Sequence, residues 1–172
     1  MTPGAAPPFT LDRFQVEANT AIDDGSNVLV AAPTGAGKTV VADHAVDRAL
    51  AQGRRAFYTT PIKALSNQKH TDLRARLGAE RVGLITGDTT IAPEAQVVVM
   101  TTEVLRNMLY SRSAALDELG VVVLDEVHYL QDRYRGPVWE EVIIHLARSV
   151  QIVALSATVS NVDELAGWLD AV

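Results

Sequence analysis

The sequence contains no cysteine, which excludes disulfide bonds and any metal site built on thiolates. Its four histidines are scattered along the chain, so a structural zinc site is not expected either. No apolar run is long enough to span a membrane. The first ten residues, MTPGAAPPFT, lack the basic and apolar regions of a secretory signal, and we therefore expect a cytoplasmic protein.

Aromatic residues make up only 5% of the chain, which disfavours a stacking platform for single-stranded nucleic acid. Positive charge is also scarce, because the net charge is −6 at pH 7 and the pI is about 5.1. A protein with this balance is not a simple electrostatic binder of nucleic acid. Any such contact has to be local, or has to use backbone amides and hydroxyl groups.

What the sequence does have is a regular alternation of two kinds of segment. We expect a flexible lead over residues 1–8 and one domain over residues 9–172, since 172 residues with 48% hydrophobic content can bury a sizeable core. Short β-rich apolar runs predict strands at 27–32, 56–60, 82–86, 97–101, 121–125 and 152–156. Segments of helical period predict helices at 38–50, 62–77, 102–110, 137–148 and 161–170. The alternation predicts an α/β fold with a mostly parallel sheet covered by helices on both faces.

The predicted strands end in polar residues. Their carboxyl ends read APTGAGKT, TTP, TGD, TTE, DEVH and SAT. Because ligands bind at the carboxyl ends of parallel strands, these motifs predict a functional site along one edge of the sheet.

The stretch APTGAGKT, from Ala32 to Thr39, follows a strand and opens a helix. It has the phosphate-binding pattern G-x-x-x-x-G-K-[ST] with Ala32 in place of the first glycine. Gly35 and Gly37 let backbone N–H groups point into one concavity, where the helix N-terminus adds partial positive charge. Lys38 is predicted to reach the β- and γ-phosphates and the Thr39 hydroxyl to hold Mg2+. A glycine-rich turn before a helix is the alternative. The other candidate nucleotide contacts in the loop are Pro33, Thr34 and Ala36.

The run VVVLDE places Asp125 and Glu126 at the end of an apolar strand with no basic residue beside them. A metal ion at a bound nucleotide would give these acids a partner. Asp125 is then predicted to bind Mg2+, and Glu126 to position and deprotonate the attacking water. With Lys38 they are the predicted catalytic residues. Without the phosphate loop the same acids would be an ordinary solvated strand end.

Six motifs together give the chain a resemblance to a known family. They are TTPIKALSNQK (59–69), TGD (86–88), MTTEVLRNMLY (100–110), DEVH (125–128), RGPVWEEVI (135–143) and LSATVSN (155–161). From Phe9 to Leu169 the chain resembles the first, RecA-like motor domain of the superkiller-like, DEVH-box helicases of superfamily two, in particular their actinobacterial members. The resemblance implies ATP and Mg2+ as cofactors and single-stranded RNA or DNA as a partner. It also implies a second RecA-like domain of the same full-length protein.

The resemblance assigns an adenine-reading role to FTLDRFQVEA (9–18). Gln15 would present its amide to the adenine edge and Phe9 would pack on the base. The alternative is the start of a helix capped by Thr10 or Asp12.

The resemblance also implies a coupling role for SAT and for the histidine of DEVH. The SAT strand is expected between the phosphate-loop strand and the DEVH strand. Ser156 and Thr158 would hydrogen-bond the 125–128 segment and link the state of the nucleotide to domain closure, or they would simply form a turn before the last helix. His128 would adjoin the nucleotide and communicate across the interdomain cleft, or it would satisfy a local backbone group.

A track for the sugar–phosphate backbone is the last implied feature. Helix N-termini and hydroxyl groups hold phosphates without much formal charge, which is compatible with the acidic pI. The predicted nucleic-acid contacts are Thr60, Pro61, Lys63, Gly87, Thr101, Thr102 and Arg106. For either basic residue alone, the alternative is a solvated helix face.

These patterns favour the ATP-binding motor domain of an ATP-dependent RNA or DNA helicase. The isolated domain is expected to be a monomer that binds nucleotide weakly and does not unwind, because the second domain of the family supplies arginine fingers. Two alternatives stay open. One is a nucleotide-gated binding or translocation module without strand separation, and the other is an unrelated phosphate-loop enzyme.

Overall fold

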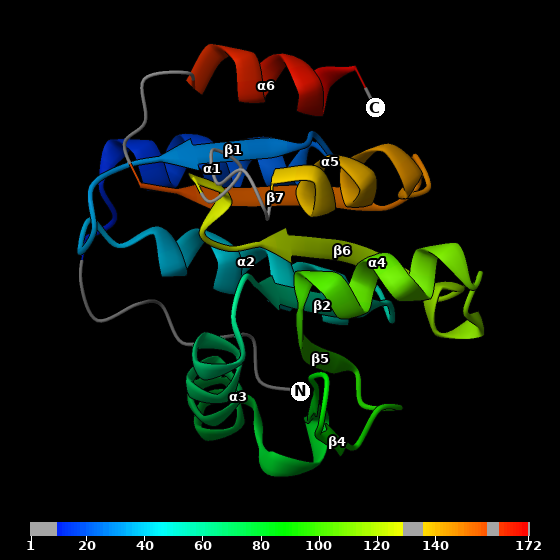
Figure 1. The fold of residues 1–172 in the computed structure, drawn as a ribbon. Helices are drawn as coiled ribbons and strands as arrows, with labels where there is room; N and C mark the ends of the chain where they lie inside the picture. The colour runs from blue at the N-terminus through cyan, green and yellow to red at the C-terminus, as the bar shows by residue number, and fades with distance from the viewer. Residues whose placement is uncertain (1–9, 129–135, 158–161, 172) are drawn as a thin grey trace.

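A computed structural model of the chain describes residues 10–128, 136–157 and 162–171, and in these ranges seven strands form one sheet (Figure 1). The strands are β1 (Val28–Ala31), β2 (Arg55–Thr60), β3 (Val82–Ile85), β4 (Thr90–Ile91), β5 (Val97–Thr101), β6 (Leu119–Leu124) and β7 (Gln151–Ser156). The helices are α1 (Arg13–Asp23), α2 (Lys38–Ala51), α3 (Lys63–Leu77), α4 (Thr102–Tyr110), α5 (Gly136–His145) and α6 (Val162–Asp170). Two 3-10 turns, η1 (Ala79–Arg81) and η2 (Ala114–Leu116), complete the described elements.

The strand order is β1-β7-β6-β2-β5-β3-β4, and the pairs are parallel except for β3 with β4. The prediction of a mostly parallel sheet is therefore confirmed. β7 lies between β1 and β6, as the resemblance implies. The antiparallel strand β4 was not predicted, because two exposed residues are too few to carry a strand pattern.

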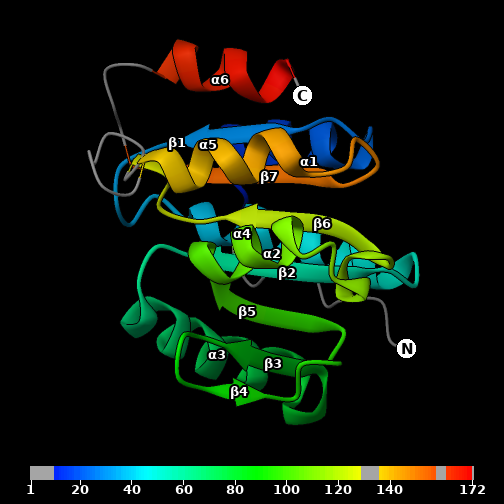
Figure 2. The ribbon, with the colours of Figure 1, turned by 45° about the vertical axis from the view of Figure 1, so that its right-hand side comes forward.

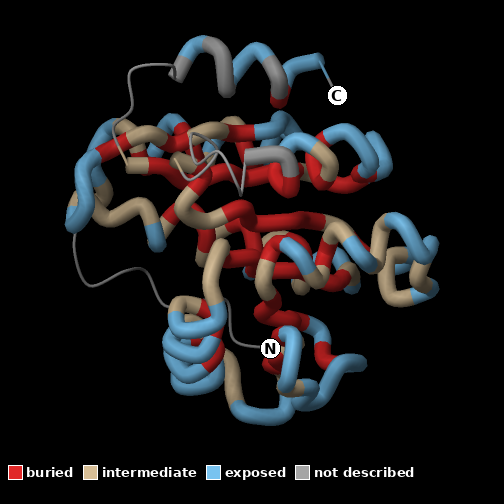
Figure 3. Tube along the Cα trace, in the orientation of Figure 1, coloured by how far each residue is buried: buried red, intermediate tan, exposed pale blue. Residues whose placement is uncertain are grey.

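Each face of the sheet is covered by helices, so the strands are apolar on both sides. In β6, Val121 and Val123 pack into the core beneath α1, α2 and α3, whereas Val122 and Leu124 pack into the core beneath α4, α5 and α6. Figure 2 shows α4 and α5 in front of the sheet and α1 and α2 behind it. Figure 3 shows the buried residues concentrated in the central strands and the exposed ones on the outer helix faces. The continuous apolar runs of the sequence thus reflect burial on both faces.

The helix ends follow local signals. Asp12 is the N-cap of α1, as the capping alternative for this segment predicts. Gly78, with φ of +102°, ends α3. The helix predicted at 137–148 already ends at His145, because the chain turns through a Val150 N–H to Ala147 C=O hydrogen bond into β7. None of the helices in the described ranges combines the length and the apolar composition of a membrane span.

Candidate functional site

The phosphate-loop segment and the DEVH segment lie at the same edge of the sheet. In the register of the parallel strands, Ala31 of β1 pairs with Ser156 of β7, and Leu124 of β6 pairs with Ala154 of β7. The arrowheads of β1 and β6 accordingly point to the same side in Figure 1. One strand separates β1 from β6, so their ends are about 9.5 Å apart at the usual strand spacing. A ligand the size of a nucleotide phosphate chain can contact both segments.

The loop after β1 has the backbone of a phosphate cradle. Gly35 and Gly37 have φ of +84° and +89°, a region that favours glycine, and α2 begins directly at Lys38. Ala32 is absent from the described non-glycine residues with positive φ, so alanine replaces the first glycine of the pattern without strain. Its N–H donates to the Ser156 carbonyl at 3.1 Å, which extends the β1–β7 pairing into the loop. Gly35 and Gly37 of the pattern thus occupy the positions where the loop backbone has positive φ.

Lys38 folds back over this loop. Its Nζ donates to the carbonyl of Ala32 at 2.6 Å and to the carbonyl of Pro33 at 3.1 Å. Pro33, Thr34, Gly35 and Thr39 are exposed, whereas Ala36, Gly37 and Lys38 are half-buried. The ammonium group is therefore held at the loop by carbonyl oxygens that an anionic ligand can replace.

Gln15 lies under the loop and is only 3% exposed. Its Oε1 accepts the backbone N–H of Asp12 at 2.8 Å, which closes a capping box at the start of α1. Its Nε2 donates to the carbonyl of Gly37 at 2.9 Å. The side chain thus ties α1 to the phosphate loop. The adenine-reading role stays a prediction, and Phe9 lies outside the described residues.

The two acids of DEVH are held in different ways. Both carboxylate oxygens of Asp125 accept a hydrogen bond, Oδ2 from the Tyr58 hydroxyl at 2.6 Å and Oδ1 from the Glu126 N–H at 2.8 Å. The Asp125 N–H donates to the Thr59 carbonyl of β2. Glu126 has φ of +60°, a conformation that costs a non-glycine residue on the order of 1–3 kcal/mol. Such strain at the second acid is typical of a functional site.

His128 connects DEVH with the SAT strand. Its Nδ1 accepts the Ala157 N–H at 3.2 Å, and its Nε2 lies 2.9 Å from Glu126 Oε2. The predicted link between the two motifs is present but uses other atoms. The Ser156 hydroxyl donates to the carbonyl of Ala157 and not to the 125–128 segment. Thr158 lies outside the described residues.

The predicted nucleic-acid contacts are only partly accessible. Thr60 is buried, and its Oγ1 lies 2.6 Å from Ser66 Oγ and donates to the carbonyl of Ile62. Thr102 is buried too and donates to the Thr60 carbonyl at 3.2 Å. Both hydroxyls therefore have internal partners in this structure, and their contact with a bound strand stays a prediction.

The other members of this set reach the surface. Lys63 and Gly87 are exposed, whereas Pro61, Thr101 and Arg106 are half-buried. Both predicted cations face acids. Lys63 pairs with Asp88 Oδ2, and Arg106 Nη1 lies 3.7 Å from Glu141 Oε2. The side chain of Lys63, followed by that of Thr86, lowers the pKa of Asp88 by hydrogen bonding. The local positive charge predicted for this track is therefore largely paired.

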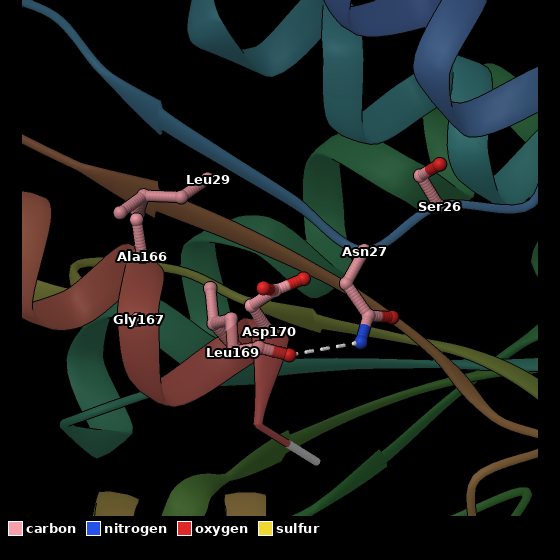
Figure 4. Close-up of a pocket in the computed structure, with 7 residues that line it drawn as sticks. All are labelled: Ser26, Asn27, Leu29, Ala166, Gly167, Leu169 and Asp170. Atoms are coloured by element: carbon pink, nitrogen blue, oxygen red, sulfur yellow. Dashed lines mark hydrogen bonds between the residues drawn. The ribbon is translucent and has the colours of Figure 1, made fainter.

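A separate hollow of about 530 Å3 lies between the start of β1 and α6, at the opposite end of β1 from the phosphate loop (Figure 4). Asn27 borders it and donates from Nδ2 to the Leu169 carbonyl at 3.3 Å, which fastens α6 to the sheet. Its lining residues are Ser26, Asn27, Leu29, Ala166, Gly167, Leu169 and Asp170, and they include no predicted site residue.

A parallel sheet in this order, with a glycine loop and an acid pair at the ends of β1 and β6, defines a RecA-like, P-loop nucleotide-binding domain. The chain belongs to the DEAD/DEAH box helicase family, whose model matches residues 12–165.

Several known helicases are similar to this chain. The probable helicase HelY of Mycobacterium tuberculosis is 62% identical over 165 residues, which are 96% of this chain and 18% of that protein. The antiviral helicase SKI2 of Saccharomyces cerevisiae is 48% identical over 167 residues, or 97% of this chain and 13% of that protein. The structure of Mycobacterium smegmatis helicase Lhr bound to ssDNA and AMP-PNP has 34% identity and a TM-score of 0.71, covering 88% of this chain and 23% of Lhr. The resemblance to superkiller-like helicases is confirmed, and the chain spans less than a fifth of these two curated relatives.

Proposed function

We propose that this chain is the first motor domain of an ATP-dependent helicase, in which ATP hydrolysis drives movement on single-stranded RNA or DNA. The observation that carries the proposal is the placement of the phosphate loop and the DEVH acids at the ends of strands that are one strand apart. Family membership and the names of the relatives agree with it. The domain would bind nucleotide as a monomer and would need a second RecA-like domain of the full-length protein to complete the motor.

The loop fits a nucleoside triphosphate. A Cβ added at Gly35 would meet nothing within 4 Å, so open space lies beside the loop, and backbone N–H groups and the N-terminus of α2 provide donors for phosphate. The donor chemistry also fits magnesium, since the Thr39 hydroxyl and the Asp125 carboxylate are hard oxygen ligands and Mg2+ commonly takes one or two protein oxygens. Bound there, Mg2+ would neutralise negative charge on the β- and γ-phosphate oxygens.

The remaining roles fall to residues that the structure holds near these groups. Lys38 would exchange its two carbonyl partners for phosphate oxygens, which are stronger acceptors because they are charged. Glu126 would accept the proton of the attacking water. His128, whose Nε2 lies 2.9 Å from Glu126 Oε2 and whose Nδ1 accepts from the Ala157 N–H, would report a change at the nucleotide to the SAT segment.

Nucleic acid would bind along the ends of β2, β5 and β3. Lys63 and Gly87 are exposed there, and Thr101 and Arg106 are half-buried. The similar helicase Lhr is bound to ssDNA and AMP-PNP in its solved structure, and this likeness supports the nucleic-acid part of the proposal. We infer backbone contact without sequence reading, because the N-termini of α3 and α4 lie at this edge and helix N-termini hold phosphates through backbone N–H groups.

The test is nucleic-acid-stimulated ATP turnover by the full-length protein. Glu126→Gln removes the proposed base and should lower turnover by about 10^2- to 10^4-fold, and Lys38→Ala should abolish it. Arg74→Ala, which changes an exposed residue of α3, is the control and should turn over ATP normally. Normal turnover in either site variant would overturn the assigned roles. ATP turnover without displacement of an RNA or DNA strand would favour a translocation module that does not unwind.

A further inference from the structure

Tyr58 is the nearest described partner of the DEVH segment that the motifs do not include. It lies on β2, beside β6, and is 1% exposed. Its hydroxyl donates to Asp125 Oδ2 at 2.6 Å, within the short range of hydrogen bonds to a charged oxygen. A buried tyrosine hydroxyl needs a partner, and here that partner is the acid proposed to bind the metal.

The hydroxyl is a permanent donor. A phenol hydroxyl is protonated throughout the physiological range, since its ordinary pKa is about 10, and in this position it donates to Asp125 Oδ2. The ring is also held in place, because Lys69 Nζ of α3 lies 4.7 Å from its centroid. Lys69 in turn lies 4.0 Å from Asp43 on α2. The position of the phenol ring is thus fixed by its place on β2 and by the ammonium group of Lys69 over its face.

Two fixed donors determine how the Asp125 carboxylate can lie. The Glu126 N–H occupies one acceptor position on Oδ1, and the Tyr58 hydroxyl occupies one on Oδ2. An ionised carboxylate has about four such positions, so about two remain for a ligand. Without the Tyr58 hydroxyl, the carboxylate would keep a single donor and could rotate.

We propose that Tyr58 is a positioning residue that orients the Asp125 carboxylate before metal and nucleotide bind. This inference rests on the proposed function, since it assumes that Asp125 is a metal ligand. Outer partners that hydrogen-bond a metal ligand typically contribute about 10- to 100-fold in metal affinity or activity.

The experiment measures Mn2+ binding to this chain in the presence of AMP-PNP, by electron paramagnetic resonance. Tyr58→Phe removes only the hydroxyl and should weaken Mn2+ binding by about 10- to 100-fold. Tyr110→Phe is the control for loss of a phenol hydroxyl, because Tyr110 is 55% exposed at the end of α4 and lies near a different acid, Glu141. Asp125→Ala tests the metal site itself. Binding of a fluorescent ADP in EDTA, which needs the loop but no metal, should be unchanged in Tyr58→Phe.

The double variant separates positioning from general damage. If Tyr58 acts through Asp125, Tyr58→Phe adds no further loss of Mn2+ affinity to Asp125→Ala. Equal Mn2+ affinity in Tyr58→Phe and Tyr110→Phe, with a clear loss in Asp125→Ala, would overturn the positioning role and leave the proposed function intact. No loss in Asp125→Ala would instead overturn the metal site of the proposed function. Unfolding of Tyr58→Phe, or a matching loss of metal-free binding, would show a structural role and overturn the proposal.

Discussion

Gln15 offers a sharp test of how α1 supports the phosphate loop, because one side chain makes two contacts that can be removed separately. Gln15→Ala deletes both the capping contact with the Asp12 N–H and the Nε2 donor to the Gly37 carbonyl. Gln15→Glu keeps an acceptor for the Asp12 N–H, since glutamate is a preferred residue at this capping-box position. It replaces the donor to Gly37 with an oxygen, so a carboxylate meets a carbonyl.

The expected cost follows from the two contacts. Loss of the cap contact removes about 1 kcal/mol, and leaving the half-buried Gly37 carbonyl without its partner adds roughly another 1 kcal/mol. A total of about 2 kcal/mol in a chain of this length corresponds to a fall in Tm of about 4–8 °C for Gln15→Ala. Thermal unfolding followed by circular dichroism measures this value.

Comparing the Tm of the two variants then shows which of the two Gln15 contacts contributes more to stability. If the hydrogen bond to the Gly37 carbonyl contributes most of this stability, Gln15→Glu is at least as destabilised as Gln15→Ala, although its capping contact with the Asp12 N–H is intact. The glutamate variant should also lose affinity for a fluorescent nucleotide, because the loop carbonyl is pushed away from its position. A Tm for Gln15→Glu equal to that of the unmodified chain would refute the argument, as would a fall of less than about 1 °C for Gln15→Ala.

Two further substitutions test the charge pattern around the site. Burial raises the pKa of Asp43, and Lys69 and Arg76 offset this only in part; because the pKa is raised, ionisation of Asp43 costs stability as pH rises through the folded-state pKa. Asp43→Asn should therefore raise Tm at neutral pH and raise it less in acid, and a lower Tm at neutral pH would contradict this reading. Hydrogen bonds from Lys63 and then Thr86 lower the pKa of Asp88. The Lys63–Asp88 ion pair therefore persists above this lowered pKa and is lost as the pH falls through it. Asp88→Asn should free Lys63 and tighten binding of a single-stranded oligonucleotide, most strongly at low salt, in a fluorescence anisotropy titration. Asp24→Asn, at an exposed site at the end of α1, is the charge-matched control, and equal tightening in both variants would show only a change in net charge.

The sequence predicted those parts of the molecule that depend on local pattern. Strands β1, β2, β3, β5, β6 and β7 all fall within or next to the predicted runs, because a strand buried on both faces has to be apolar throughout. The glycines at 35 and 37 were predicted from the loop pattern, and both have the positive φ that the pattern requires. Strand order is different, since it depends on which crossover follows which strand. The place of β7 came only from the resemblance.

Side-chain direction is the part that the sequence did not reveal. Hydroxyls at strand ends suggested a phosphate track, but Thr60 and Thr102 turn inward and bond Ser66 and the Thr60 carbonyl. The contact of Tyr58 with DEVH was not predicted, because AFYTT has the pattern of an ordinary strand. The sequence did contain an indication of this contact. Tyr58 lies two residues before the end of a central strand, and a buried tyrosine hydroxyl usually needs a hydrogen-bond partner nearby. A burial pattern alone cannot tell which partner that is.

Strand β2 lies between the half of the edge proposed for the nucleotide and the half proposed for nucleic acid. On one side, it holds DEVH twice, through the Tyr58 hydroxyl and through the Thr59 carbonyl that accepts the Asp125 N–H. On the other side, the Thr60 carbonyl accepts from Thr102 at the start of α4. These groups are on three consecutive residues of one central strand, so a deformation of β2 would act on both the DEVH segment and the start of α4. Close packing on both faces opposes such deformation. Strand β2 is therefore the described element whose hydrogen bonds reach both the acids proposed to act at the nucleotide and the start of α4.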